Sequence, residues 1–308
     1  MSRRLQLFGK VMASVLLLAA TAAQSAVRDY TLYITAGNLT INGAGGTTMS
    51  AWGYSDVSGS PKIPGPALTA VEGDTVNITV VNNHNINHNF VIQGVTTDAT
   101  AIAPGGSRQY SFTASTAGTY LYSDTLNSDV NRALGMYGAL VVGAAGGGNQ
   151  AWTGGPGYSF QRTWVIGEMD KPRWNDVAGS GGTVNTAVYK PNYFLINGRG
   201  GFDGMGAADT TIDGMVGTSC LVRIVNGGQF SHSLHFHGNH VQVLTINGVR
   251  QASPYKLVDV INVPPKGTAD VLFVLNQPGE YPMHVHTAQM ETANGVYLNG
   301  VATMIMMH

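Results

Sequence analysis

The sequence predicts an all-β protein built from two β-sandwiches in tandem. The chain has 308 residues, which is enough for two domains of roughly 130–150 residues each. Glycine is abundant, at 41 residues, and short runs of Val, Thr and Asn recur between turn signals, a composition that favours short strands over long helices. The third observation is an internal duplication, because the two halves of the chain present the same signals in the same order.

The chain begins with a segment that is typical of a targeting signal. Three basic residues precede the apolar run VMASVLLLAA, and TAAQSA then supplies small residues for cleavage. The apolar run is too short to span a bilayer comfortably, so we expect a signal peptide over residues 1–26, cleaved near Ser25 or Ala26. Retention as an uncleaved anchor is the alternative. We expect a bacterial periplasmic, secreted or cell-surface protein with no membrane span after cleavage.

The first domain, predicted over residues 27–144, shows strand periodicity. In TVNITVV, which begins at Thr75, polar and apolar residues alternate, and this period of two predicts a half-buried strand. The segments HNFVIQG, PGGSRQYSFTASTAGTYLYSD and LGMYGALVVG complete the unit.

The second domain, predicted over residues 161–308, repeats this series. Its matching segments are VGTSCLVRIVNGG, HSLHFHG, PPKGTADVLFVLNQPGEYPMHVH and NGVATMIMM. The stretch between the domains is low in complexity and rich in glycine, so we predict a linker over residues 145–160. The repeat is too long for a solenoid and fits two sandwiches.

Composition excludes several classes of function. Only 11% of the residues are charged and the formal net charge is −1, so we expect no binding to nucleic acid. No nucleophile–base pair, phosphate-binding loop or carboxylate pair stands out. Cys220 is the only cysteine, so no intramolecular disulfide can form. Its simplest interpretation is a small buried apolar side chain, with a metal thiolate or an intermolecular bond as the alternatives.

The histidines of the second domain carry the strongest functional signal. Six of the nine histidines lie in the two short segments 232–240 and 284–286. Alternate residues of a strand share a face, so the paired histidines in HFH and HVH each project to one side. Imidazole suits Cu(II), Zn and Ni, whereas the methionines nearby favour Cu(I). We predict a metal site here; the alternative is that these histidines are relics without a ligand.

Four stretches together resemble the multicopper oxidases and the copper nitrite reductases. They are IPGPAL followed by EGDTV, YFLINGRGGFDG, HSLHFHGNHVQVL and GEYPMHVH, of which HSLHFHG is the most specific. The resemblance covers nearly the whole mature chain. It implies two tandem cupredoxin-like Greek-key β-sandwiches, copper as the cofactor and oxidoreductase-type chemistry. It also implies the homotrimer that two-domain multicopper oxidases usually form.

The resemblance assigns a copper cluster to four histidines of the second domain. His235 and His237 match one of the histidine pairs that serve a trinuclear cluster, and His284 and His286 match another. The first domain has lost the matching pairs, whose places are taken by Val91, Gln93 and the segment 123–125. The standard cluster cannot form without them. We therefore expect one or two copper ions per chain, held by the second domain alone.

The resemblance also shows that the blue-copper ligands are broken. His232 matches a blue-copper histidine, but Val285 stands in the place of the cysteine and Met290 in the place of the second histidine. A blue-copper centre needs a thiolate, so we expect no such electron relay. His232 is then either a metal ligand or a hydrogen-bonded core residue. Met290, His240 at the rim of the motif and His88 in the first domain are weaker metal candidates.

These features predict an exported, multicopper-oxidase-like copper-binding protein that handles copper or performs limited redox chemistry. One alternative is an active copper oxidoreductase, of the oxidase or nitrite reductase type, completed by a partner chain or an external electron donor. Another is a structural or surface-assembly module on a degenerate cupredoxin scaffold. A redox or copper-donor protein is the partner that the first two imply. The sequence identifies neither a catalytic residue nor a substrate.

Overall fold

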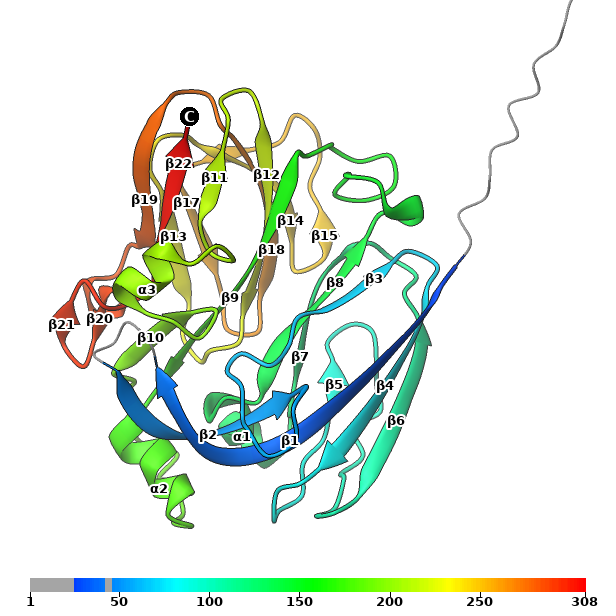
Figure 1. Cartoon of the computed structure of the whole chain (residues 1–308), viewed down its shortest axis with the longest axis vertical. Coiled ribbons are helices and arrows are strands. Elements are labelled where there is room, and N and C mark those ends of the chain that lie inside the picture. Colours follow the sequence, from blue (N-terminus) through cyan, green and yellow to red (C-terminus); the bar gives the residue numbers. More distant parts are fainter. Residues whose placement is uncertain (1–24, 42–45) are drawn as a thin grey trace, which may run out of the picture.

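The protein is described by a computed structural model that covers residues 25–41 and 46–308. Strands dominate and the helices are short, which confirms the predicted all-β class (Figure 1). Residues 1–24, most of the predicted signal peptide, lie outside the described part. Among the described residues, no helix is both long and apolar enough to cross a membrane.

Two four-stranded sheets form the N-terminal half. Their strand orders are β2-β1-β4-β6 and β3-β8-β7-β5. The strands are β1 (Val27–Ile41), β2 (Thr47–Ser55), β3 (Leu68–Val71), β4 (Thr75–Asn82), β5 (Val91–Ile92), β6 (Ser107–Thr113), β7 (Gly118–Ser123) and β8 (Tyr137–Gly143). The alternation that predicted β4 is real, since Val76, Ile78 and Val80 are fully buried between the sheets.

The C-terminal half contains a nine-stranded and a five-stranded sheet. The larger has the order β15-β14-β18-β12-β9-β10-β20-β21, with β16 beside β14, and the smaller has the order β11-β22-β19-β13-β17. The strands are β9 (Phe160–Met169), β10 (Tyr193–Ile196), β11 (Ile212–Gly214), β12 (Ser219–Asn226), β13 (His232–Phe236), β14 (Val241–Ile246), β15 (Val249–Arg250), β16 (Leu257–Val258), β17 (Val260–Val263), β18 (Thr268–Val274), β19 (Gly279–Val285), β20 (Thr292–Ala293), β21 (Val296–Tyr297) and β22 (Ala302–Met307).

Helices are confined to short connecting segments. They are η1 (Asn127–Asp129), α1 (Val130–Ala133), η2 (Ala145–Gly147), η3 (Lys171–Asn175), α2 (Asp176–Gly179), α3 (Gly201–Gly206) and η4 (Ala288–Glu291).

The internal duplication is visible in the strand pairing. In the first half β4 pairs parallel with β1 and antiparallel with β6, and in the second half β12 pairs in the same way with β9 and β18. The pairings β5–β7, β7–β8 and β3–β8 likewise correspond to β13–β19, β19–β22 and β11–β22. Repeated sequence signals therefore reflect a repeated topology.

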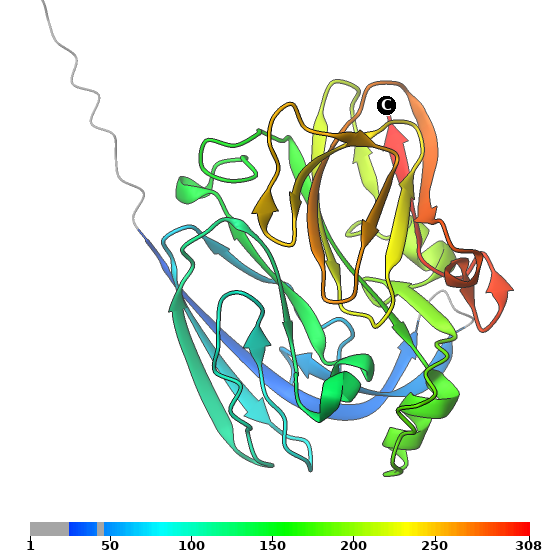
Figure 2. The ribbon, with the colours of Figure 1, turned by 180° about the vertical axis from the view of Figure 1, so that it is seen from behind.

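The two halves pack against each other as Figure 2 shows from behind. An apolar cluster joins them and includes Met49 and Tyr137 of the first half with Val165 and Tyr193 of the second. The glycine-rich segment between the halves also packs, because Trp152 is buried in a cluster drawn from both. Apolar contacts therefore fix the second half of the chain against the first.

Candidate metal centre

Strands β13 and β19 bring the two histidine motifs together. They pair antiparallel, and His235 stands directly opposite His284 in the register. The backbone N–H of His286 donates to the carbonyl of Ser233 at 2.7 Å, which extends this pairing past the end of β19. Two motifs that are far apart in the sequence therefore lie on neighbouring strands of the five-stranded sheet.

The pleat of each strand decides which side chains reach the site. In β13, Leu234 and Phe236 face the core while His235 lies half-buried on the other face. The chain turns just beyond His237, where Gly238 has a φ of +83° and a Cβ would lie 2.7 Å from the ring of Tyr281. The final glycine of HSLHFHG is thus needed for the turn that closes the motif.

Three of the four predicted ligands form a compact nitrogen cluster. A ligand nitrogen from each of His235, His237 and His284 lies within 4.8 Å of the others, and the Nε2 atoms of His237 and His284 are 3.1 Å apart. The ring of His286 completes the group, with its centre 4.9 Å from that of His235. Within residues 25–41 and 46–308, this is the one such group of three or more potential ligands.

Hydrogen-bond acceptors hold the outer nitrogens of two of these rings. Nδ1 of His235 lies 3.2 Å from the carbonyl oxygen of Asp259, and Nδ1 of His284 contacts the carboxylate of Glu291. Because these partners accept hydrogen bonds, each Nδ1 carries the proton and each Nε2 keeps its lone pair. The rings are therefore held in the tautomer that a metal ligand requires.

The electrostatics of the cluster favour a neutral imidazole at His237. Burial, followed by repulsion from the other three rings, lowers the pKa of His237 below its ordinary value. A neutral ring offers a lone pair, whereas an imidazolium does not. The arrangement thus keeps a donor nitrogen available near neutral pH.

The residues fit a transition metal ion. Two imidazole nitrogens that bind one metal at about 2.0–2.1 Å lie roughly 3 Å apart, close to the 3.1 Å between His237 and His284. A shallow pocket of about 480 Å³ borders the cluster and is lined by His235, His237, His240, Asp259 and Tyr281, among others. A metal held here would be open to small molecules from solvent.

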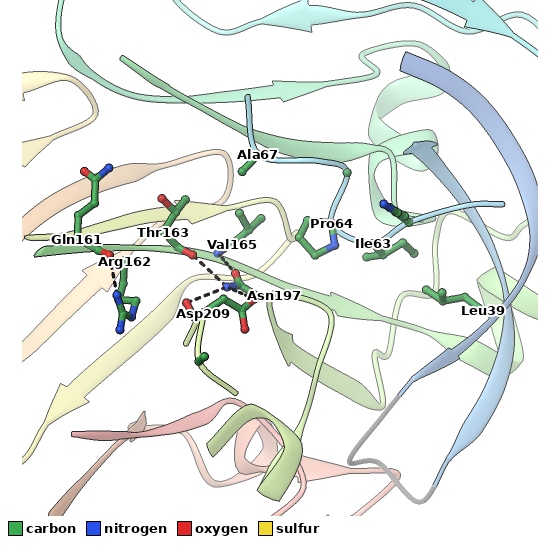
Figure 3. A pocket seen from close by; sticks show the side chains of 13 residues that line it. Leu39, Ile63, Pro64, Ala67, Gln161, Arg162, Thr163, Val165, Asn197 and Asp209 are labelled. Atoms are coloured by element: carbon green, nitrogen blue, oxygen red, sulfur yellow. Dashed lines mark hydrogen bonds between the residues drawn. The ribbon is translucent and has the colours of Figure 1, made fainter. Parts of the chain in front are cut away.

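A separate cleft between the two halves is lined by other kinds of residue than the pocket beside the histidines. It has a volume of about 490 Å³, and Figure 3 shows Ile63 and Pro64 on one side and Thr163 and Asn197 on the other. The amide of Asn197 donates to the carbonyl of Thr163 at 3.0 Å, which braces the wall. Among the described residues that line this cleft there is no histidine, so they offer no imidazole for a metal.

Comparison with known proteins shows the family to which the chain belongs. Models of the multicopper oxidase family match residues 36–146 and 176–299, which together make up most of the chain. The chain belongs to the multicopper oxidase superfamily. This confirms the resemblance in the sequence, and the fold is that of tandem cupredoxin-like domains.

Two curated relatives illustrate the range of this superfamily. The copper-containing nitrite reductase of Alcaligenes xylosoxydans xylosoxydans is 27% identical over 263 residues, which cover 78% of this chain and 76% of that protein. Laccase-8 of Oryza sativa subsp. japonica is 23% identical over 313 residues, which cover 95% of this chain and 53% of the laccase. The chain therefore spans about half the length of that laccase.

Solved structures show the same fold. The blue copper oxidase from Nitrosomonas europaea superposes with a TM-score of 0.76 at 20% identity, covering 91% of this chain and 86% of that one. The copper nitrite reductase of the same organism gives a TM-score of 0.71 at 20% identity, covering 92% and 94% of the two chains.

His232 lies apart from the histidine cluster. This side chain lies on the opposite face of β13 from His235, is fully buried, and places Nε2 2.9 Å from Oε2 of Glu168. Glu168, on β9, also accepts hydrogen bonds from the backbone N–H groups of Gln229 and Phe230. The structure thus does not bring His232 to the other four histidines, but pairs it with a buried carboxylate.

The remaining blue-copper positions are part of the apolar core. Val285 is fully buried and Met290 nearly so, and both pack in the main cluster of the second half. Cys220 belongs to the same cluster, where burial raises the pKa of its thiol to about 12. A buried thiol with this pKa remains protonated in the metal-free protein near neutral pH.

The weaker candidates have other surroundings. His240 is exposed and lines the pocket beside the cluster. His88 is fully buried in the first half, where Nδ1 lies 2.6 Å from Oδ2 of Asp124 and Nε2 lies 2.7 Å from Nδ1 of His84. Both nitrogens of His88 are therefore engaged within the first half of the chain.

Sequence reasoning missed the acidic residues whose carbonyl or carboxylate oxygens hold the histidines. Glu291 follows the last motif by five residues, whereas Asp259 and Glu168 come from other strands or loops. Each is a single acidic residue without a motif, and only strand pairing brings it to its partner. Of these three acidic residues, only Glu291 lies close to the HVH motif in the sequence.

Proposed function

We propose that this protein is an exported copper-binding protein that holds one or two copper ions on His235, His237, His284 and His286. The observation that supports this most directly is the 3.1 Å approach of two Nε2 atoms within a cluster of four imidazoles. The proposed role is copper handling or limited redox chemistry in the periplasm or at the cell surface. The paired HFH and HVH motifs are the ligand set.

Residues of this chain prepare the site in three ways. Asp259 and Glu291 hold the rings of His235 and His284 with Nε2 turned toward the cluster. Burial keeps the imidazole of His237 neutral. The pocket that includes His240 leaves one side open to small molecules. Copper bound here would supply one-electron redox chemistry and Lewis acidity.

The electron supply limits the chemistry we propose. A blue-copper centre receives electrons through its thiolate, and here Val285 fills that position while Cys220 stays a buried thiol. A slow or externally driven reaction at an open site fits these residues better than rapid transfer from a second copper centre.

Metal analysis of the purified mature protein tests the proposal. We expect copper in the wild-type protein and its loss in the His284→Ala/His286→Ala double variant. His308→Ala is the matched control, because His308 is an exposed histidine that follows β22 at the end opposite the site. A wild-type protein without copper affinity, or a double variant that retains all its copper, contradicts the assignment.

Electron paramagnetic resonance adds the ligand type. We expect a tetragonal Cu(II) signal from nitrogen ligands without an intense blue absorption band. An intense blue band would show that a thiolate binds the copper, against the position of Cys220.

An active copper oxidoreductase is the second candidate, favoured by the open pocket and by relatives that are named laccases and copper-containing nitrite reductases. A partner chain or an external donor would supply what the first half lacks, and a homotrimer is the assembly that we propose. Oxygen uptake and nitrite reduction by copper-loaded protein test this. Turnover no faster than that of free Cu(II) counts against it.

The effect of a chelator on thermal stability distinguishes the copper proposal from a purely structural role. If the metal site matters, a chelator should lower the melting temperature, because a ligand that binds only the folded state stabilises it. An unchanged melting temperature and oligomeric state would favour an assembly module instead.

A further inference from the structure

A chain of hydrogen bonds runs outward from a buried carboxylate in the first half. Oδ2 of Asp124 accepts from the amide of Asn131 at 2.9 Å and contacts Nδ1 of His88 at 2.6 Å. Nε2 of His88 in turn lies 2.7 Å from Nδ1 of His84. Asp124 and His88 are fully buried, while His84 is partly exposed. The chain thus connects the protein interior to its surface.

The geometry determines how protons can be arranged along this chain. The carboxylate of Asp124 acts as a hydrogen-bond acceptor, and the backbone N–H of Leu126 also donates to it at 2.8 Å. Nδ1 of His88 is therefore the donor in its hydrogen bond to Asp124. If His88 is neutral, its Nε2 accepts from Nδ1 of His84, and Nε2 of His84 carries a lone pair. If His88 is charged, the direction reverses and Nε2 of His84 carries a proton.

When a proton binds at His84, the outer end of the chain, the positive charge therefore moves inward to His88. When Nε2 of His84 takes up a proton, the proton on its Nδ1 passes to Nε2 of His88. The positive charge then lies on His88, in contact with the Asp124 carboxylate. Burial and repulsion from His88 lower the pKa of His84 to about 4, which agrees with a ring that passes its charge inward.

Few other titratable groups are near the chain. Tyr54 packs beside it, but its hydroxyl donates to the carbonyl of Asn89, and burial raises its pKa well above the ordinary value. The ring of Trp52 contacts both imidazoles edge-on, with centre distances of 4.7 Å to His84 and 5.6 Å to His88. Asp124 is thus the one charged partner that these contacts provide for the two rings.

The outer end of the chain lines a pocket of about 460 Å³. Its walls come from the first half and from the loop after α2, and they include Asn38, Ser50, Trp52, His84 and Asn85. Among its lining residues there is no Asp, Glu, Lys or Arg. The volume is in the range of small-molecule sites, and the uncharged lining suits a neutral ligand.

We propose that this pocket binds a neutral polyhydroxylated molecule of monosaccharide size, with one ligand hydroxyl hydrogen-bonded to Nε2 of His84 at the end of a two-imidazole relay. A hydroxyl both donates and accepts, so it pairs with His84 in either state of the relay, whereas an ether can only accept. Trp52 supplies an aromatic surface, and Asn38, Ser50 and Asn85 supply further donors and acceptors. This inference is independent of copper binding by the second half.

Nitrogen-15 NMR of histidine-labelled mature protein, kept copper-free so that signals stay sharp, tests the relay. When the relay takes up a proton in acid, we expect His84 to change from the Nδ1–H to the Nε2–H tautomer while it remains neutral. Two rings that titrate independently, or a tautomer of His84 that does not change, would overturn the relay.

Titration with D-glucose tests the binding site, with 1,4-dioxane as the probe that lacks hydroxyls. We expect glucose, but not dioxane, to cause a saturable shift of the His84 signals and a change in the tryptophan fluorescence of the protein, to which Trp52 contributes. No saturable response to glucose, or an equal response to dioxane, overturns the proposed ligand class even where the tautomer changes.

Asp124→Asn connects the two results. This near-isosteric variant removes the carboxylate, so we expect it to abolish the tautomer change and to weaken glucose binding about tenfold. Asp98→Asn is the matched control, because Asp98 lies in the same half, is partly exposed and pairs with Arg108. Equal glucose affinity in all three proteins contradicts a role for the relay, and circular dichroism identifies any variant that fails to fold.

If Asp124→Asn does not fold, His84→Gln replaces it. Gln retains a polar side chain at the pocket but ends the relay, so weaker glucose binding with intact copper content is the expected result. Unchanged glucose binding overturns the proposal.

Discussion

Nε2 of His237 lies 3.1 Å from Nε2 of His284, although 47 positions separate the two residues in the chain. The approach depends on the pairing of β13 with β19 and on acceptors that hold the opposite side of the rings. The metal affinity of this pair should therefore depend on residues that do not touch the metal themselves.

Glu291 is the first residue for which this dependence can be measured. Glu291→Gln removes the charge that holds Nδ1 of His284, and we expect copper affinity to fall about 10–100-fold with the four histidines intact. Isothermal titration calorimetry measures the change. Glu280→Gln is the control, because Glu280 is exposed and lies on β19, the strand that carries His284. This variant should leave the copper affinity unchanged. Equal affinities in both variants contradict the holding role.

The buried pair of His232 and Glu168 should contribute to stability rather than to copper binding. His232→Leu leaves the Glu168 carboxylate buried with one partner fewer, which should cost about 3–5 kcal/mol in the free energy of unfolding. Glu168→Leu should lower the free energy of unfolding less in the His232→Leu variant than in the wild-type protein, because the two residues are coupled. Urea unfolding gives both values. A loss of copper in folded His232→Leu would show that His232 is a ligand after all.

Cys220 should be chemically inert in the folded protein. It is fully buried and its pKa is raised to about 12, so almost no thiolate is present near neutral pH. We expect a thiol reagent such as Ellman's reagent to react with none of the protein when it is folded and with one thiol per chain in 6 M guanidinium. Rapid reaction of the folded protein would show that this thiol is accessible.

His84 should make the protein sensitive to acid. Its pKa in the folded state is about 4, below the ordinary value near 6.5, so the unfolded chain binds the proton first as the pH falls. The stability that this residue contributes is complete above about pH 6.5 and is lost between about pH 6.5 and 4. For a partly exposed ring we expect a loss of about 1 kcal/mol between pH 7 and 5.

Urea unfolding of metal-free protein at both pH values measures this loss. His84→Gln should reduce the difference, whereas His308→Gln, which changes an exposed histidine, should not. A His84→Gln protein that loses as much stability as the wild type in acid would place the effect on another group.

Much of the architecture follows from local sequence patterns. The alternation in β4 predicts its buried face because successive side chains of a strand point to opposite sides, whatever the strand pairs with. The same rule places His235 and His237 on one face and predicts that His284 and His286 share another. The repetition of signals in the two halves likewise predicts two similar domains.

The pairing of those faces could be decided only by the tertiary structure. The register of β13 with β19 sets His235 opposite His284, and the pleat turns His232 into the core toward Glu168 on a different sheet. Glu291 and the chain from Asp124 through His88 to His84 have no sequence motif. The residues that these contacts join are separated in the sequence by intervals that do not predict how close they lie in space. The contacts form only when packing brings the strands together.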